Sequence, residues 1–381
     1  MKLGMGFLFQ NYTDWERFEA LERGEEVGPP QKPDAEIMAE QFALADLVEP
    51  LGWDSIWAFE QHAQPYLMQP NPLAFLMRAA ARTKKIDVGT MLVVLPWWNP
   101  IRLAEDLAYL QHVLGPGREI YFGVGRGLAR RNFKSMGIDP DEARGRFNEV
   151  FEIVKKAFTE EMFSYEGEYY SYKDVSIRPA PLSPNPLLNP LGGYTSEPSL
   201  IELAKRGFHP LTTPNKTRES YEEEMGRFNA IRIENGHGPA NGPVLQVMTF
   251  CAESEAEAKE ACEQWFYENA NATNHAYEIG TENFGSAKGF EAYKSAEGSD
   301  FGDGTPESTI QTLLTKFFRD AVWGTPQMCA ERIIELEEQF GLSQLVNVTS
   351  FGTMPAERSE KSMRLFAEQV MPKIQHLRDE N

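Results

Sequence analysis

Basic residues are scarce in this chain. Its 381 residues include 37 Lys and Arg against 57 Asp and Glu, which gives a formal net charge of −20. Proteins that bind nucleic acids, or that bind membrane surfaces through basic segments, need a surplus of Lys and Arg to neutralise phosphates. The charge argues against both classes, so we expect neither a nucleic-acid partner nor a membrane partner.

Cysteine is rare and long apolar runs are missing. The three cysteines (Cys251, Cys262 and Cys329) are far apart and show no C-x-x-C spacing, as in a protein without disulfides. No run reaches the roughly eighteen apolar residues that a membrane-spanning helix needs. The apolar start, Met1–Phe9, contains two glycines and is followed by no cleavage pattern, so we interpret it as a β-strand and not as a secretion signal. These features predict a cytoplasmic protein.

Strand-like and helix-like segments alternate along the chain, whose hydrophobic fraction of 41% is enough for a buried core. Runs such as Ile86–Leu95 are apolar on both faces, which is typical of parallel strands covered by helices. About eight strand–helix units predict an α/β fold of the (β/α)8 (TIM) barrel type, in preference to an open doubly wound sheet. The expected strands are Lys2–Phe9, Asp54–Phe59, Ile86–Leu95, Glu119–Val124, Leu187–Tyr194, Phe208–Thr213, Val244–Cys251 and Gln344–Phe351.

No long linker divides the chain, so we predict one barrel domain over residues 1–381. Three segments do not fit the repeat and are expected to be long loop insertions: 10–33, 162–186 and 280–306. Three helix starts share one pattern, an Asn or Thr followed by proline, which suits the N-cap and the first turn of a helix. They are Asn71-Pro72, Asn99-Pro100 and Thr325-Pro326.

In such barrels the active site lies at the C-terminal ends of the strands. Glycines 123, 125 and 127 follow one strand as G-x-G-x-G, but position 128 is Leu128, and we expect no helix directly behind it. A dinucleotide-binding fingerprint is therefore a poor interpretation. A tight, glycine-rich strand end and an anion-binding loop both remain open.

Local charge favours the anion-binding interpretation. Between Gly115 and Lys134 there is one acidic residue, Glu119, against five basic residues: Arg118, Arg126, Arg130, Arg131 and Lys134. Thr195 and Ser196 precede an expected helix, where hydroxyls and free amides favour a phosphate. Simple helix capping is the alternative for these two residues, although Arg126 on a neighbouring strand end favours a phosphate site.

His62 follows Glu60 and Gln61 at the end of the second expected strand. It is either a solvated, hydrogen-bonded histidine or a proton carrier. The remaining histidines lack metal-ligand spacing and there is no G-x-S-x-G motif, so we expect neither a metal nor a nucleophilic site. A phosphate site with few ionisable groups suits an enzyme whose cofactor performs the difficult chemistry.

These residues resemble the bacterial luciferase-like flavin monooxygenases, a family of (β/α)8 barrels that use reduced FMN or, in some branches, coenzyme F420. The similarity extends over nearly the whole chain in the right order, and its combined motifs are specific. It lies in Trp53–Trp57 with Glu60-Gln61-His62, Val88–Pro96, Pro100–Asp106, Phe122–Leu128, Thr195-Ser196, Ala204–Gly207, Gly324-Thr325-Pro326 and Val370-Met371-Pro372.

The resemblance implies roles for individual residues. Arg126, with Thr195 and Ser196, would bind the flavin phosphate. Met91 and Leu92 would support the isoalloxazine ring through a cis peptide bond. The same cofactor site would include Gly125, Gly127 and Leu128, while His62 and Gln61 would be the catalytic hydrogen-bond donors.

The implied activity is that of a two-component monooxygenase. Reduced FMN from a separate flavin reductase would react with O2 to a C4a-peroxyflavin and oxygenate a small apolar organic substrate such as an aldehyde or ketone. Tyr66, Trp97 and Trp98 favour an apolar substrate, and a homodimer is the expected assembly. The alternatives are an F420-dependent hydride-transfer oxidoreductase and a non-catalytic partner subunit like the luciferase beta chain.

Two departures from the luciferase alpha pattern argue against light emission. Gln61 replaces the first of two consecutive histidines, and Gly125 replaces a reactive cysteine. Glycine at position 125 is expected to open space above the flavin and to admit a bulkier substrate.

Overall fold

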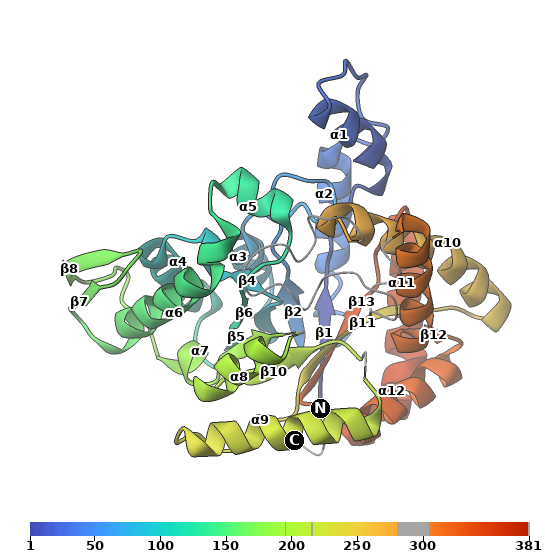
Figure 1. Ribbon diagram of the computed structural model, residues 1–381. Helices are drawn as coiled ribbons and strands as arrows, with labels where there is room; N and C mark the ends of the chain where they lie inside the picture. The colour runs from blue at the N-terminus through green and yellow to red at the C-terminus, as the bar shows by residue number, and fades with distance from the viewer. Residues whose placement is uncertain (195, 215, 280–304, 380–381) are drawn as a thin grey trace.

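The computed structural model describes residues 1–381 except 195, 215, 280–304 and 380–381. Its main sheet consists of parallel strands surrounded by helices (Figure 1). The strands of this sheet are β1 (Lys2–Gly6), β2 (Ser55–Ala58), β3 (Asp87–Thr90), β4 (Val93–Val94), β5 (Ile120–Tyr121), β6 (Gly123–Gly125), β9 (Leu191–Gly193), β10 (His209–Thr212), β11 (Val244–Cys251), β12 (Val322–Gly324) and β13 (Gln344–Val348).

The sheet closes on itself through two barrel strands that are each divided into two short pieces. The chain runs from β3 into β4 and from β5 into β6; β3 pairs with β5, and β4 pairs with β6. The ring continues from β6 through β9, β10, β11, β13, β1 and β2 back to β3, and every one of these pairings is parallel. With the interrupted strands counted once each, eight strands form the barrel, while β12 pairs only with the end of β11. The predicted (β/α)8 barrel is confirmed.

Complete burial explains why the strands are recognisable in the sequence. Every residue of β2, β3 and β13 is buried, as expected for strands with the barrel interior on one face and helices on the other. The helices are α1 (Trp15–Glu22), α2 (Asp34–Ala45), α3 (Pro72–Arg82), α4 (Pro100–Leu114), α5 (Arg130–Met136), α6 (Ala143–Thr159), α7 (Asn185–Leu188), α8 (Glu197–Lys205), α9 (Arg218–Glu234), α10 (Glu255–Tyr277), α11 (Pro306–Asp320), α12 (Pro326–Phe340), α13 (Ala356–Leu365) and α14 (Gln375–Asp379).

The three predicted Asn/Thr-Pro helix starts are confirmed. The Asn71 side chain accepts a hydrogen bond from the Ala74 amide, Asn99 accepts from two amides of α4, and Thr325 accepts from the Met328 amide. In each helix the proline follows at the first position, where its missing N–H costs nothing.

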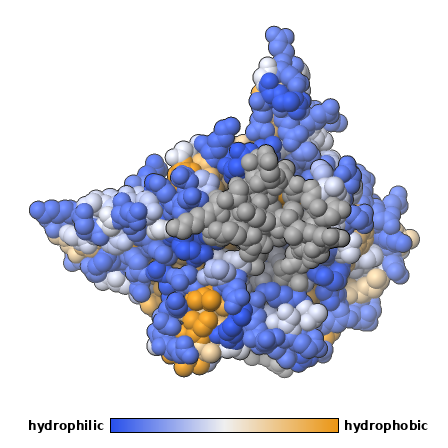
Figure 2. Space-filling view, in the orientation of Figure 1, coloured by the Kyte–Doolittle hydropathy of each residue, from blue (hydrophilic) through white to orange (hydrophobic). Residues whose placement is uncertain are grey.

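Two of the predicted insertions have structure of their own. Residues 10–33 contain α1, which projects from the barrel in Figure 1 and has a mostly hydrophilic surface in Figure 2. Residues 162–186 contain the antiparallel hairpin of β7 (Phe163–Glu166) and β8 (Ser171–Val175), followed by α7. Of the third insertion, 280–306, residues 280–304 lie outside the described residues.

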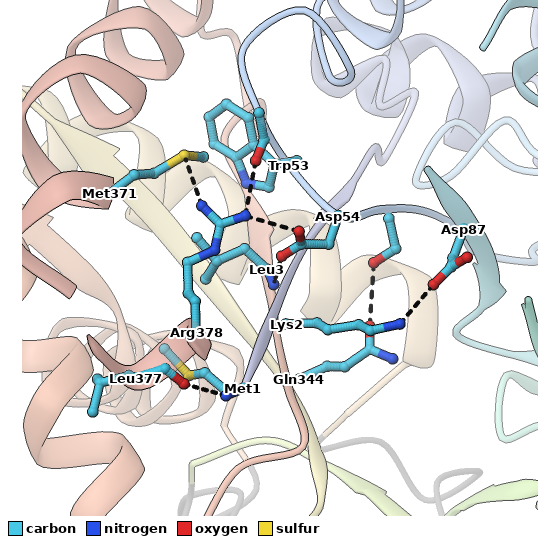
Figure 3. Close-up of polar contacts among 12 residues, drawn as sticks. Met1, Lys2, Leu3, Trp53, Asp54, Asp87, Gln344, Met371, Leu377 and Arg378 are labelled. Atoms are coloured by element: carbon cyan, nitrogen blue, oxygen red, sulfur yellow. Dashed lines mark hydrogen bonds and ion pairs between the residues drawn. The ribbon is translucent and has the colours of Figure 1, made fainter. Parts of the chain in front are cut away.

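Charged contacts close the N-terminal end of the barrel (Figure 3). One Asp54 carboxylate oxygen accepts from the Leu3 amide and the other from the Arg378 guanidinium, each at 2.8 Å. Lys2 donates to Asp87 at 2.8 Å and to the Tyr121 hydroxyl at 2.7 Å. Burial opposes the Lys2 charge, yet these hydrogen bonds leave its pKa above the ordinary value. Among the described helices, none combines the length and apolarity needed to cross a bilayer.

Candidate active site

A cavity of about 440 Å³ lies at the C-terminal ends of the barrel strands, where the sequence predicted the site. Seven of the predicted site residues line it: Gln61, Met91, Leu92, Gly125, Arg126, Gly127 and Leu128. Ser196 is buried beside it, and His62 lies behind its wall. The predicted Thr195 lies outside the described residues.

One end of the cavity is cationic and rich in hydroxyls. Arg126 follows β6, and Arg144 belongs to the first turn of α6; their guanidinium groups donate to the Ser199 hydroxyl at 3.3 and 3.4 Å. The Ser196 hydroxyl donates to the same oxygen at 3.0 Å and makes no capping bond to the α8 backbone. The simple-capping alternative for Ser196 is therefore wrong. Two guanidinium groups meet two hydroxyls at the start of a nine-residue helix, whose dipole also favours an anion.

The other predicted basic residues do not join this site. Arg118 lies at the opposite end of its strand, where it donates to the Ala80 carbonyl and the Thr83 hydroxyl. Arg130 pairs with Glu278 at 2.6 Å, and Arg131 pairs with Glu22 at 3.1 Å. Of the five basic residues at 118–134, Arg126 is the one that lines the cavity. The expectation of one basic cluster is wrong, because residues adjacent in sequence point to different neighbours.

Sequence reasoning missed Arg144 and Ser199. Both belong to helices that follow strands of the barrel, not to the strand ends at which the sequence predicts the site. Ser199 could have been predicted from the sequence, because it lies three residues after Ser196 on the first turn of α8. Nothing in the sequence indicates that Arg144 and Arg126 approach the same hydroxyl.

The Leu92 side chain packs against the glycine-rich end of β6. The Met91–Leu92 peptide bond is cis, as the resemblance implied. A Cβ atom at position 125 would lie 2.5 Å from one Leu92 methyl carbon, and a Cβ atom at 193 would lie 2.5 Å from the other. The expectation that Gly125 opens space above a flavin is wrong, because Leu92 fills that space. The expectation of no helix directly behind the glycines is also wrong, since α5 begins at Arg130.

Glu60 joins the end of β2 to β4 and to the segment that follows β4. Its side chain is fully buried and accepts from the Val94 amide at 2.6 Å, from the Trp98 indole at 2.9 Å and from the His62 ring at 2.9 Å. Burial raises the pKa of Glu60, and these three hydrogen bonds oppose that rise. The His62 ring also meets Trp97 edge-on, with centroids 5.2 Å apart. His62 therefore contacts the cavity wall from outside, through Glu60 and Trp97, which both line it.

Gln61 lies inside the cavity and is held by its neighbours. Its amide nitrogen donates to the Tyr277 hydroxyl at 2.9 Å. Its amide oxygen accepts from Gln64 at 2.8 Å and from the Asn132 side chain. Gln61 thus connects the end of β2 with α5 and α10, in a fixed orientation.

The rest of the cavity is mainly apolar. Its walls include Leu8, Phe59, Leu67, Trp97, Met248, Leu313 and Phe317. Helix α10 contributes a polar row at helical spacing, Asn269, Thr273 and Tyr277, to the same space. A cavity with one cationic, hydroxyl-rich end and one apolar end, at the C-terminal ends of the strands, is typical of the active site of a barrel enzyme.

Comparison with known proteins identifies the family. The model of the luciferase-like monooxygenases matches residues 22–343, so this chain belongs to that family and is an oxidoreductase. It is 26% identical over 353 residues to the alkanal monooxygenase alpha chain of Photorhabdus luminescens, covering 90% of this chain and 94% of that protein.

Solved structures agree with this assignment. The monooxygenase RslO1 from Streptomyces bottropensis superimposes with a TM-score of 0.75 at 26% identity, covering 98% of this chain and 99% of that one. The oxygenating constituent of 3,6-diketocamphane monooxygenase from Pseudomonas putida, in complex with FMN, has the same fold with a TM-score of 0.69 at 20% identity over 98% and 99% of the two chains. The F420-dependent glucose-6-phosphate dehydrogenase of Kineococcus radiotolerans is 33% identical over 213 residues, 52% of this chain and 61% of that enzyme.

Proposed function

We propose that this protein is the oxygenase component of a two-component flavin-dependent monooxygenase. In this proposal reduced FMN comes from a separate reductase, and one oxygen atom of O2 is transferred to a small apolar organic substrate such as an aldehyde or ketone. The main support is the cavity, in which the Arg126, Arg144, Ser196 and Ser199 site adjoins an apolar chamber.

The residues present fit FMN. Its phosphate is a dianion, and two guanidinium groups with two hydroxyls form a donor set suited to it. Leu92, packed between Gly125 and Gly193, offers an apolar surface to a flat ring. When bound and reduced, the flavin would supply the electrons that activate O2.

The chain's own contribution would be positioning and the exclusion of water. Trp97, Phe317 and Leu313 provide apolar walls that keep water from the reacting atoms. Gln61 would donate a hydrogen bond inside the cavity. His62 would hold a proton at Nε2, in its hydrogen bond to Glu60, and would influence the cavity through the Glu60 carboxyl group.

Oxygen incorporation tests the proposal directly. The protein, a flavin reductase, NADH, FMN and aliphatic ketones would be incubated under 18O2, and the products examined by mass spectrometry. One 18O atom in a product, dependent on this protein, is expected. Consumption of NADH and O2 with no labelled organic product from a panel of aldehydes and ketones would contradict the proposal.

An F420-dependent hydride transfer is the second candidate, favoured by the paired Arg126 and Arg144, which also suit an acidic cofactor tail. Anaerobic titration separates the two candidates. Tighter binding of reduced FMN than of reduced F420 supports the oxygenase, whereas the reverse order supports hydride transfer.

We also propose a homodimer, which light scattering on the purified protein would show as twice the chain mass.

A further inference from the structure

Asn269 differs from its two neighbours in the polar row of α10 in what it is bonded to. It lies on α10, is 3% exposed and lines the cavity. Of its two neighbours in the polar row, Thr273 donates to the Asn269 backbone carbonyl at 2.7 Å and contacts the Tyr66 hydroxyl at 3.1 Å, and Tyr277 accepts from Gln61. Within the described part of the chain, the side-chain nitrogen of Asn269 donates only to the Met248 sulfur, at 3.5 Å. A thioether is a weak acceptor.

A chain of hydrogen bonds fixes which way the Asn269 amide points. The Gly352 backbone N–H, which can only donate, lies 2.5 Å from the Gln10 amide oxygen. The Gln10 amide nitrogen must therefore face Asn269, to which it donates at 3.3 Å. Asn269 accepts with its oxygen, so its nitrogen is turned toward Met248, whose side chain also lines the cavity.

We propose that Asn269 is a specificity-determining residue that donates a hydrogen bond to the carbonyl oxygen of the substrate. A carbonyl oxygen is a much better acceptor than the Met248 sulfur and would replace it as the partner of the buried N–H. The side chains of Leu8, Phe59 and Met91, which line the same cavity, are apolar and would contact the hydrocarbon part of the substrate. The inference deepens the proposed function, on which it rests, by naming the residue that separates carbonyl compounds from hydrocarbons of the same shape.

The test compares two ligands that differ in one group. Acetophenone and α-methylstyrene have nearly the same shape, but C=O in the first is C=CH2 in the second. Their affinities for the purified protein, without flavin, reductase or substrate turnover, would be measured by ligand-observed NMR. We expect the native protein to bind acetophenone about fivefold to tenfold more tightly, as one neutral hydrogen bond allows.

Asn269→Leu keeps the branched outline of the side chain, although leucine is somewhat larger, and removes the donor. The ratio of the two affinities is expected to fall to about one, chiefly through loss of acetophenone binding. Gln246→Leu is the matched control, because Gln246 also has an amide that lines the cavity, and this variant should keep the native ratio. Measuring both ligands on one sample makes the ratio independent of the folded fraction.

Equal affinities for the native protein, or a ratio unchanged in Asn269→Leu, would overturn the assignment. A ratio lost in Gln246→Leu and kept in Asn269→Leu would transfer the role to Gln246. Because no flavin or O2 is present, these outcomes are independent of the 18O experiment. If the protein incorporates 18O but binds both ligands equally, only the role of Asn269 is refuted. If it prefers acetophenone but incorporates no 18O, only the proposed reaction is refuted.

Discussion

The two ends of the barrel use charge in different ways. At the N-terminal end, Lys2 and Arg378 meet the carboxylates of Asp87 and Asp54, so cation and anion belong to the same chain (Figure 3). At the C-terminal end, Arg126 and Arg144 meet the Ser199 hydroxyl beside a cavity. The ion pairs of the first end join segments of the chain and stabilise the fold, whereas the guanidinium groups of the second end line a cavity at the strand ends where barrel enzymes bind their ligands.

Glu60 should show the largest effect on stability, because its carboxyl group lies at the ligand end, is fully buried and accepts hydrogen bonds from three residues of the chain. Glu60→Ala removes the acceptor of three hydrogen bonds in a fully buried place. We expect the free energy of unfolding to fall by about 3–5 kcal/mol. Urea unfolding measures it, and Glu60→Gln, which keeps one acceptor oxygen, should lose clearly less. A loss below about 1 kcal/mol in the alanine variant would contradict the structural role of Glu60.

Arg126→Ala tests the ligand end by binding. We expect FMN affinity to fall by about one to two orders of magnitude, which corresponds to one charged hydrogen-bonding group. Riboflavin, which lacks the phosphate, should bind the variant and the native protein equally well. Fluorescence titration measures both ligands, with Arg126→Lys as an intermediate control. Equal losses for FMN and riboflavin would place Arg126 away from the phosphate.

Asp54→Ala tests the closed end. The change removes the acceptor for the Leu3 amide and for Arg378. Because the Asp54 side chain is about one-third exposed, at 32%, the expected loss of stability is only about 1–2 kcal/mol. FMN affinity should stay at the native value. Thermal unfolding measures the loss, and Arg378→Met in the Asp54→Ala background should add little.

Acid should also weaken the closed end through His209, at the start of β10. Its Nδ1 accepts from the Asn241 amide at 2.8 Å, and burial, together with the charge of Arg232, lowers its pKa from 6.5 to about 4. Between these two values the unfolded chain binds a proton that the folded protein does not. Stability should therefore fall as pH decreases from about 6.5 to 4, by roughly 1–2 kcal/mol. Urea unfolding at several pH values measures this, and His209→Gln should flatten that part of the profile.

Arg130→Gln should have the smallest effect. Its partner is Glu278, and its own side chain is 44% exposed, so the pair contributes at most about 0.5 kcal/mol. Since Arg130 does not line the cavity, we expect FMN affinity within about twofold of the native value. A large loss of FMN binding would restore the predicted basic cluster as the anion site.

The fold could be predicted from the sequence because its signals are local. Buried strands such as β11 appear as mainly apolar runs, and Asn99-Pro100 determines a helix start through contacts within three residues. The hairpin of β7 and β8 was predicted only as an insertion, since its exposed strands lack an apolar pattern.

The candidate site was predicted in part. Strand ends gave Gln61, Met91, Gly125 and Arg126, which do line the cavity. The direction and the partner of each side chain were not predictable, because they depend on neighbours that are distant in sequence. Arg130 turns to Glu278, and His62 binds Glu60 and is not among the residues that line the cavity.

The sequence by itself determined the barrel, the strand end at which Arg126 lies and the resemblance to the flavin monooxygenases, because these depend on local pattern and order along the chain. Only the tertiary structure decided which groups meet. It brought Arg144 to Ser199, placed Leu92 against Gly125, and turned the Asn269 amide toward the cavity through Gln10, which lies 259 positions away. The physical reason is that hydrogen bonds and close packing act over a few ångströms in space, whatever the distance along the chain.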